Sequence, residues 1–290
     1  MKKIILFGFG RPLIELYQNL KSNYDIIGIV TDYERRKKNP EFYDFVAAEN
    51  LNLIDCEHVR ALNPDLILVF NYNKIIDASK IGELLVLNIH MGILPTYRGN
   101  GANSWSILNG NKTVGYTLHE INEILDGGKI FYRFEYEIQD NETYAHARKA
   151  MDVDLKTNFL SVLDNVLNHR LEGVEQQNEK FIYASRLYPE DGILANWNYE
   201  TEAIFNHQIV FSKPMGTGLK MKFKDQFIEI SKISSIPDYL NSFGFPGAVV
   251  NILNESIWVK TKDTAISIDE IMIDGKPTAP STLYKIGERL

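Results

Sequence analysis

The chain has 290 residues, 44% of them hydrophobic and 24% charged, and its formal net charge is −7. The length suits two domains, the composition excludes a disordered chain, and the negative charge argues against a nucleic-acid partner. The single cysteine, Cys56, excludes a disulfide framework and a cysteine-based metal site, so we interpret it as a structural thiol and expect no bound metal.

The first residues, MKKIILFGFG, resemble a secretory signal only superficially, because their apolar run is short and lacks a small-residue cleavage site. No run approaches the ~18 consecutive apolar residues of a membrane span. We therefore expect a cytoplasmic protein without a membrane partner.

Short apolar runs alternate with helical spacing over the first 90 residues. Strands are predicted at 4–9, 25–31, 65–70 and 84–90, and helices at 11–21, 41–50 and 73–84. Strands that are nearly continuous in apolar residues suit a parallel sheet covered on both faces. The pattern predicts an α/β fold with a doubly wound, mostly parallel, Rossmann-like sheet, in which ligands bind beyond the carboxyl ends of the strands.

The segment GFGRPL after the first strand is similar to a dinucleotide-binding fingerprint, and Asp32 lies where a ribose-binding acid would be. However, Leu13 replaces the third glycine, and Pro12 suits the first turn of a helix. A tight turn or a loop for another ligand explains the segment better than a nicotinamide site, which stays an alternative.

The middle of the chain continues with one helix and two strands, predicted at 102–109, 114–121 and 129–138. Residues 140–170 follow as one long helical pattern, with Asp140 or Asn141 as the expected N-cap. Residues 181–192 then have the composition of a connector.

Beyond residue 190 the hydrophobic period changes to two, which is the spacing of a strand. In LKMKFKDQFIEI one face carries Leu219, Met221 and Phe223, and the other carries Lys220, Lys222 and Lys224. Further strands with tight turns are predicted within 245–276. We therefore expect a catalytic domain at 1–182, a linker at 183–189 and a small antiparallel, OB-like β-barrel at 190–290.

Asn88 and His90 lie two residues apart at the end of a predicted strand, so their side chains face the same side. A strand-end histidine is often structural, but here an amide partner and a Gly/Pro-rich loop accompany it. An amide donates to oxygen without changing charge, and an imidazole exchanges a proton near neutral pH. The pair suits acyl transfer, with Asn88 stabilising an oxyanion and His90 handling protons.

A carboxylate is expected to orient this histidine and to tune its charge. Asp126, in the loop NEILDGGK, is the best candidate, because Gly127 and Gly128 allow backbone to approach a ligand closely. Glu120 and Glu123 are alternatives that we expect to be solvated. No serine or cysteine stands where a covalent nucleophile is expected, so the nucleophile should come from the substrate.

These motifs resemble, in order, those of the folate-dependent formyltransferases, a family that includes methionyl-tRNA, glycinamide-ribonucleotide and sugar N-formyltransferases. The matching pieces are Asn88-x-His90, Leu94-Pro95, Arg98-Gly99 and Asp126-x-Gly128 after VGYTLHEINEI. The later YASRLYPEDGILANW, FPGAVVN and AISIDEIMIDGK are similar to the linker and C-terminal barrel of the tRNA and aminoarabinose-type enzymes. The resemblance implies an enzyme that moves a formyl group from 10-formyltetrahydrofolate to an amine, with Asn88, His90 and Asp126 as catalytic residues.

The resemblance also implies which residues hold the two substrates. The folate should contact FNYNKII and the loop before Asp126, largely through backbone, at Phe70, Asn71, Tyr72, Ile75, Ile124 and Asp126. The acceptor should contact Gly8, Arg11, Met91, Gly92, Tyr97, Arg98 and Gly99. Two positions depart from the family pattern, since Gly92 replaces a common serine and Gly127 a common threonine, and these departures leave the acceptor contacts open.

The family that the chain resembles formylates three classes of acceptor: glycinamide ribonucleotide, methionyl-tRNA and amino sugars. The glycinamide enzymes are shorter single domains, so the added barrel argues against them. Residues 190–290 hold 10 Lys and Arg against 13 Asp and Glu, which argues against tRNA; the lysine face and the basic cluster at 35–38 are exceptions that we interpret as solvated.

The segments YRGNGANSWSILNG and GYTLH look closer to the sugar enzymes. We therefore predict an N-formyltransferase for a nucleotide-linked amino sugar, in bacterial surface-glycan biosynthesis, and we allow for a homodimer. A methionyl-tRNA formyltransferase is the alternative. A catalytically silent or RNA-binding module would be favoured only if Asn88, His90 or Asp126 were absent.

Overall fold

The computed structural model describes residues 1–32, 39–77, 82–177, 180–224, 226–237 and 244–290. The chain forms two compact units, of which the first contains residues 1–103, 115–136 and 149–185. The second contains residues 104–114, 137–148 and 186–290. The basic cluster at 35–38 lies outside the described residues, as does part of the helix predicted at 73–84.

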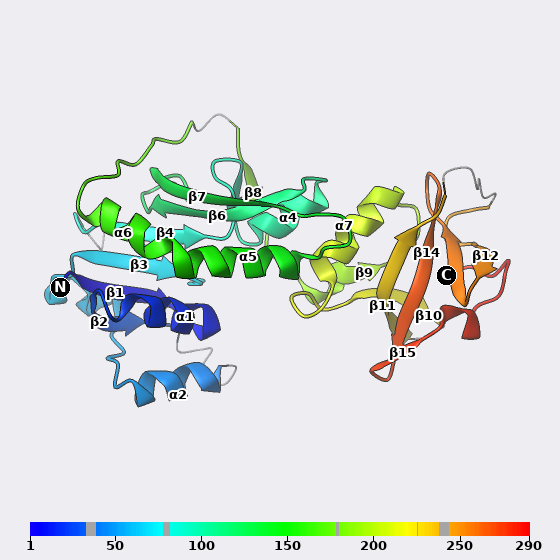
Figure 1. Cartoon of the computed structure of the whole chain (residues 1–290), viewed down its shortest axis with the longest axis horizontal. Coiled ribbons are helices and arrows are strands. Elements are labelled where there is room, and N and C mark those ends of the chain that lie inside the picture. The colour runs from blue at the N-terminus through cyan, green and yellow to red at the C-terminus, as the bar shows by residue number, and fades with distance from the viewer. Residues whose placement is uncertain (33–38, 78–81, 178–179, 225, 238–243) are drawn as a thin grey trace. The chain divides into compact units, whose positions relative to one another are not determined.

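The first unit is built on a six-stranded sheet in the order β2-β1-β3-β4-β6-β7 (Figure 1). Its strands are β1 (Lys3–Gly8), β2 (Asp25–Val30), β3 (Leu66–Phe70), β4 (Val86–His90), β6 (Thr113–Glu120) and β7 (Ile130–Glu137). The first four pair in parallel, whereas β6 is antiparallel to β4. The four strands predicted in the first 90 residues are confirmed, and the sheet as a whole is mixed.

Burial explains the sequences of the central strands. All residues of β1 after Lys3, and every residue of β3, are buried. Strands covered on both faces need apolar side chains at every position, so their sequences do not alternate.

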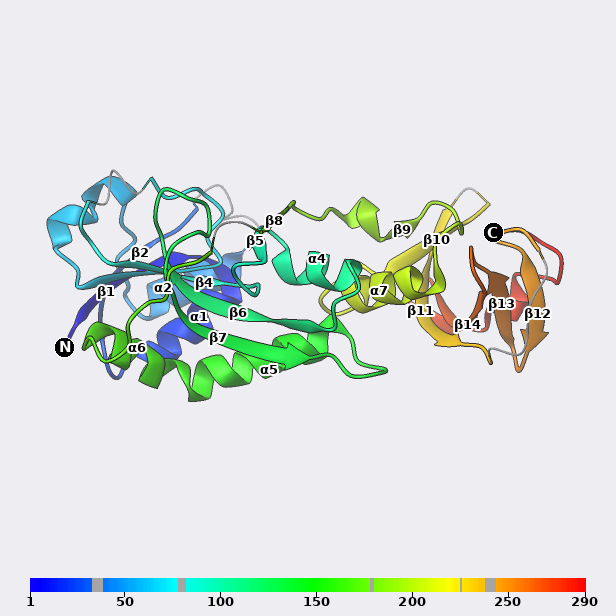
Figure 2. The same cartoon turned by 90° about the horizontal axis from the view of Figure 1, so that it is seen from above.

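Helices α1, α5 and α6 lie along one face of this sheet (Figures 1 and 2). Among the described residues up to 170, the helices are α1 (Gly10–Leu20), α2 (Pro40–Ala48), α4 (Ala102–Leu108), α5 (Tyr144–Thr157) and α6 (Phe159–Leu167). Short 3₁₀ turns, η2 (Cys56–His58) and η3 (Arg60–Leu62), precede β3. The side chain of Asn19 donates to the carbonyl oxygen of Leu155 at 2.7 Å, which ties α1 to α5.

Two helix predictions are wrong in the described residues. Residues 73–77 are not helical. The single helix expected at 140–170 is divided into two helices at Asn158. The side chain of Asn158 donates a hydrogen bond back to the carboxylate of Asp154. Neither Asp140 nor Asn141 is the N-cap, because Asn141 has a left-handed φ of 68° and the first helix starts only at Tyr144.

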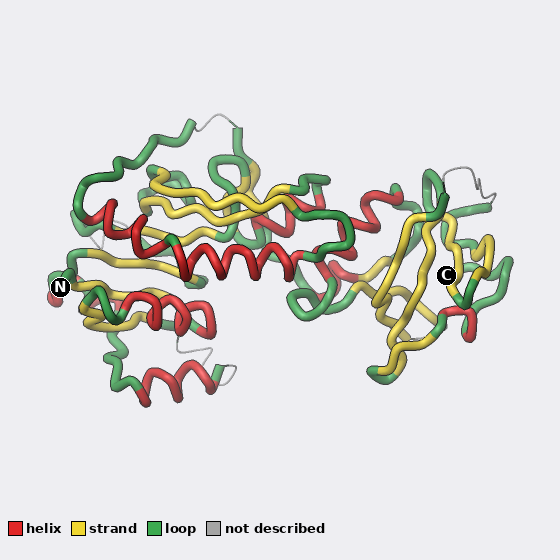
Figure 3. The backbone as a smooth tube through the Cα atoms, viewed as in Figure 1, coloured by secondary structure: helices red, strands yellow, loops and turns green. Residues whose placement is uncertain are grey.

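The second unit is dominated by a seven-stranded sheet, drawn in yellow in Figure 3. Its strands are β9 (Ile193–Leu194), β10 (Leu219–Phe223), β11 (Gln226–Ser235), β12 (Val249–Leu253), β13 (Ser256–Lys260), β14 (Ala265–Ile273) and β15 (Lys276–Thr278). The pairings run β12-β13-β14-β11-β10-β9, with β15 on β14. Among the described residues this path is open, so the pairings establish a sheet domain and not a closed barrel.

The period-two pattern of this unit is confirmed in β10. Leu219 and Met221 are buried, whereas Lys222 is exposed. The unit also contains a helix that the sequence analysis did not predict, α7 (Thr201–Phe211), and the turns η4 (Pro189–Gly192) and η5 (Pro280–Thr282). In the described part of the chain, no helix is both long and apolar enough to cross a membrane.

Candidate active site

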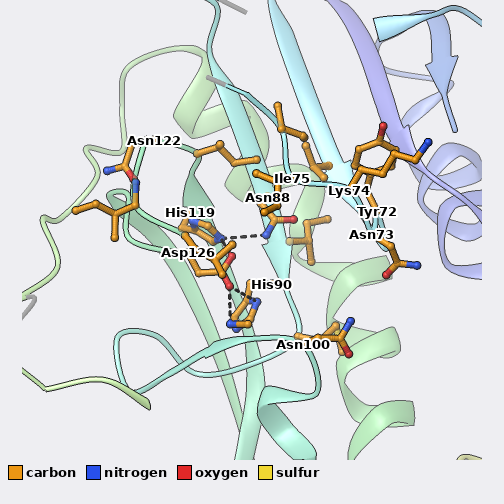
Figure 4. Close-up of a pocket in the computed structure, with 18 of the residues that line it drawn as sticks. Tyr72, Asn73, Lys74, Ile75, Asn88, His90, Asn100, His119, Asn122 and Asp126 are labelled. Carbon is orange, nitrogen blue, oxygen red and sulfur yellow. Dashed lines mark hydrogen bonds and ion pairs between the residues drawn. The ribbon is translucent and has the colours of Figure 1, made fainter. Parts of the chain in front are cut away.

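A pocket of about 820 Å³ opens in the first unit where β3 and β4 end (Figure 4). Its wall is formed by residues within 71–77, 88–91, 99–101 and 119–126. These segments follow the carboxyl ends of neighbouring parallel strands or the antiparallel strand β6, as expected for a ligand site in this class of sheet. Nine of the predicted site residues line it, namely Asn71, Tyr72, Ile75, Asn88, His90, Met91, Gly99, Ile124 and Asp126.

Asn88 and His90 lie on β4 and point into this pocket, as their spacing predicts. His90 is buried, with 7% of its surface exposed. Its Nε2 atom is 2.9 Å from the carbonyl oxygen of Tyr97. A carbonyl only accepts, so Nε2 carries the proton of the neutral ring, and the lone pair is on Nδ1.

His90 Nδ1 faces the carboxylate of Asp126, with Nδ1 and Oδ2 separated by 3.6 Å. Burial lowers the pKa of His90 below its ordinary value, and the attraction of Asp126 opposes that shift. The histidine is therefore a neutral base with one carboxylate placed to stabilise its charged form.

Asp126 is held by several neighbours at once. Its Oδ2 accepts from the backbone N–H of Gly99 at 2.7 Å, and its Oδ1 lies 3.5 Å from Nε2 of His119. Burial acts to raise the pKa of Asp126, but the protonated forms of His119 and His90, together with the Gly99 N–H, lower it to about 2. The carboxylate is thus charged throughout the neutral range.

His119 is a site residue that the sequence analysis did not identify. The register between β4 and β6 sets it opposite Asn88, and its Nε2 lies 3.1 Å from Asn88 Nδ2. Its Nδ1 is 2.8 Å from the Glu120 carbonyl, so Nε2 of the neutral ring accepts from the Asn88 amide. One amide hydrogen of Asn88 is fixed in this way, and the other remains for a ligand.

Gly128 allows the loop that follows Asp126 to lie against the sheet. A Cβ atom on Gly128 would stand 2.0 Å from the carbonyl oxygen of Glu120. Such an overlap with backbone excludes any side chain there. The close approach is therefore between the loop and strand β6, and it holds the Asp126 loop against the sheet.

Comparison with known proteins agrees with this geometry. Residues 27–162 match the formyl transferase family, and residues 186–287 match the C-terminal domain of formyl transferases. The chain belongs to the formyltransferase family. Membership of this family means that the protein is an enzyme, as the resemblance implied.

Curated relatives of this formyltransferase include two kinds of protein. The bifunctional polymyxin resistance protein ArnA of Wigglesworthia glossinidia brevipalpis is 26% identical over 91% of this chain, which spans only 42% of that relative. The methionyl-tRNA formyltransferase of Ruminiclostridium cellulolyticum is 27% identical over 99% of this chain and 97% of the relative.

A solved structure with the same fold is that of the N-formyltransferase from Helicobacter canadensis, in complex with folinic acid and dTDP-3-aminofucose. The TM-score is 0.71, at 17% identity, over 92% of this chain and 99% of that one. At this identity the likeness establishes the fold alone.

The remaining predicted contact residues of this formyltransferase do not line the pocket. They are Phe70, Gly8, Arg11, Gly92, Tyr97 and Arg98. Arg11 is paired with Glu15 at 2.9 Å on an exposed part of α1. Gly8 meets β3, because a Cβ on it would stand 1.9 Å from the carbonyl oxygen of Phe70.

Tyr97 and Arg98 belong to the short strand β5 (Tyr97–Gly99), which pairs with β8 (Ile182–Ala184). The backbone carbonyl of Tyr97 accepts a hydrogen bond from His90. The side chain of Arg98 is fully buried. Of the three carboxylates considered, Asp126 is the one that lies beside His90, with Oδ2 3.6 Å from Nδ1. Within the described ranges, no group of three or more His, Cys, Asp or Glu side chains could hold a metal ion.

Proposed function

We propose that this enzyme transfers a formyl group from 10-formyltetrahydrofolate to the amine of a nucleotide-linked amino sugar. The observation that carries the proposal is the meeting of Asn88, His90 and Asp126 in one pocket, where a base, a carboxylate beside it and an amide donor face the same space. The reaction takes place in the cytoplasm, as expected from the sequence.

His90 is the general base of this proposal. Its Nε2 proton is engaged by Tyr97, so it accepts a proton from the attacking amine at Nδ1, directly or through water. The new Nδ1–H then faces Asp126 Oδ2, and the opposite charges stabilise each other in a buried place. Asp126 stays ionised throughout, because its pKa is about 2.

Asn88 is the oxyanion donor. Its Nδ2 amide is held by His119 and has a second N–H to donate to the formyl oxygen as negative charge develops there. A donor that is already oriented needs no rearrangement during the reaction, and one such donor contributes about 3–4 kcal/mol.

The residues of the pocket fit a reduced folate. Ile75 and Ile124 line the pocket with 87% and 43% of their surfaces exposed, and a flat ring system would cover this apolar surface. Backbone groups of 71–73 and 121–125 lie beside it and suit the polar edge of a pterin. The folate supplies the formyl group, and all proton handling falls to the protein.

The sugar acceptor is favoured by several observations. The structural neighbour from Helicobacter canadensis contains folinic acid together with a nucleotide-linked amino sugar, and it matches this chain over 92% of its length. Residues 190–290 have a net negative charge, which does not suit a phosphate-rich surface such as tRNA. We propose the domain limits 1–182, 183–189 and 190–290 and an OB-like form for the last.

The second candidate is methionyl-tRNA formyl transfer. The observation that favours it is the 27% identity to a methionyl-tRNA formyltransferase over 99% of this chain. The two candidates share the donor and the catalytic residues and differ only in the acceptor.

The decisive experiment is a formyl-transfer assay with 10-formyltetrahydrofolate against a panel of nucleotide amino sugars and against initiator methionyl-tRNA. We expect turnover with at least one sugar and none with tRNA. Turnover with the tRNA alone would replace the sugar proposal by the second candidate. Turnover that His90→Ala leaves unchanged would refute the catalytic assignment for either acceptor.

A further inference from the structure

Arg98 is a charged side chain buried at 0% exposure outside the pocket. Its Nη2 donates to Oε1 of Gln176 at 2.8 Å, and its guanidinium carbon lies 4.3 Å from the centre of the Phe181 ring. Burying a guanidinium is costly unless its contacts are specific. The contacts of Arg98 lead towards the catalytic carboxylate.

Gln176 connects Arg98 to the turn that carries Asp126. The glutamine is 7% exposed, and its Nε2 donates to the carbonyl oxygens of Asp126 at 2.8 Å and of Gly128 at 2.7 Å. Asp126 itself has a left-handed φ of 50°, which is uncommon outside glycine. A single amide therefore holds both ends of a turn whose backbone needs support.

The segment that carries Gln176 is anchored on both sides. Val174 and Ile130 exchange two backbone hydrogen bonds of 2.8 Å, and β8 pairs in parallel with β5. Strand β5 in turn donates the Gly99 N–H to the Asp126 carboxylate. Hydrogen bonds from Gln176 and from β5 thus fix both the backbone and the carboxylate of Asp126.

We propose that Arg98 and Gln176 are positioning residues that set the distance between the Asp126 carboxylate and His90 without lining the substrate pocket. Arg98 orients the Gln176 amide by engaging its oxygen, so that both N–H groups point at the turn. The importance of that distance for turnover rests on the proposed function, whereas the distance itself can be tested without any substrate.

Gln176→Glu separates this role from plain packing. The glutamate keeps an acceptor for Arg98 and nearly the same shape, but it has no N–H for Asp126 and Gly128. Its charged oxygen would then face two carbonyl oxygens, which repel it and displace the turn. A residue that only filled space or accepted a hydrogen bond from Arg98 would tolerate this change.

The matched control is Gln139→Glu. Gln139 also donates its side-chain Nε2 to a backbone carbonyl, that of Glu137 at 2.8 Å, but it is exposed and does not line the pocket that contains His90. The same chemical change at this position removes the same kind of hydrogen bond without touching the Asp126 turn.

The first measurement is the titration of the His90 ring by NMR in the protein without substrates, with His90→Gln used for assignment. His90 faces the Asp126 carboxylate, the His119 ring at a centroid distance of 6.0 Å, and the Tyr97 carbonyl. Arg98 lies 2.8 Å from the Gln176 side-chain oxygen and would neutralise the carboxylate that Gln176→Glu introduces. Moving Asp126 away then removes the attraction that favours the charged ring, so His90 should titrate at a lower pH in Gln176→Glu than in the wild type. The control variant should titrate as the wild type does.

The second measurement is steady-state kinetics of the full chain. Gln176→Glu should lower kcat by roughly 10- to 100-fold, as expected for a small displacement of a catalytic group, with both KM values nearly unchanged. Arg98→Met should act in the same direction, and circular dichroism will show whether this buried change still folds.

An unchanged or higher His90 titration in a folded Gln176→Glu protein would overturn the proposal. Wild-type kcat in that variant would overturn it as well. A wild type that turns over no acceptor would instead contradict the proposed function, and the titration would still decide the positioning role.

Discussion

Each polar side chain of the pocket has its chemistry set by what surrounds it. Burial keeps His90 neutral, and Asp126 lies 3.6 Å away, where it can stabilise the positive charge that develops on the ring. The backbone carbonyl of Tyr97 decides which ring nitrogen is free. A histidine with these neighbours is a base at one defined atom, which an exposed histidine is not.

The pH dependence of turnover tests this arrangement. The active form of His90 is the neutral base, so kcat should fall as pH drops through its pKa, which burial holds below the ordinary value. Asp126→Asn removes the attraction that opposes this lowering. Its kcat should be roughly 10²- to 10⁴-fold lower, and its acidic limb should move to lower pH.

The measurement is kcat against pH for wild type and Asp126→Asn, with Asp140→Asn as the control on an exposed turn. An acidic limb that stays in place after Asp126→Asn would show that the carboxylate does not act on the histidine.

Asn88 and His119 should act as one group. Asn88→Ala removes the oxyanion donor and should cost roughly 10²- to 10³-fold in kcat. His119→Leu leaves the amide in place but removes the acceptor that orients it, so its effect should be smaller. The double variant should lose much less than the product of the two single losses, because His119 acts partly through the Asn88 amide and partly beside Asp126. Independent, multiplying losses in single-turnover assays would contradict this coupling.

At the scale of elements, pairing register decides which side chains meet. Strand β6 runs antiparallel to β4, and that register sets His119 beside Asn88. A shift of one residue would turn every side chain of β6 to the other face. The hydrogen bonding between β4 and β6 therefore sets the position of Asn88 relative to His119.

Strand β10 offers a test of the alternation in the second unit. Met221 has 0% exposure and Lys222 is exposed. Met221→Ala should lower the free energy of unfolding by about 2–5 kcal/mol, since it leaves a cavity in the core. Lys222→Ala should change it by less than ~0.5 kcal/mol. Urea unfolding of both variants measures the contrast, and equal effects would mean that the strand does not have one buried face.

At the scale of the whole molecule, the net negative charge argues against tRNA as the acceptor of the formyl group. The chain has a formal charge of −7, and a protein that neutralises many phosphates releases counterions and binds with a steep dependence on salt. We expect weak tRNA binding even at low salt.

Reversal of charge at Lys220, Lys222 and Lys224 should leave turnover nearly unchanged. Filter binding of tRNA over a range of salt concentrations, with the triple Lys→Glu variant as comparison, measures both expectations. Tight binding with a steep salt slope that the variant abolishes would favour the tRNA acceptor.

The amino-acid sequence by itself determined the elements whose signal is local. Continuous apolar runs specify β1 and β3, because a strand buried on both faces has few polar positions. The alternation of β10 and the shared face of Asn88 and His90 follow from the period of a strand. Asp126 could be chosen by sequence motif. The helix break at Asn158 and the helix α7 could not, because neither has a clear local signal in the apolar spacing.

Only the tertiary structure decided which distant residues share the site and what each of them does. His119 meets Asn88 through a strand register, and Gln176 reaches the Asp126 turn from 50 residues along the chain. Arg98, expected at the acceptor, is buried behind the turn instead. A sequence records the type and spacing of a polar group, but its partners depend on how segments far apart in the chain pack, and packing sets the pKa, the tautomer and the role.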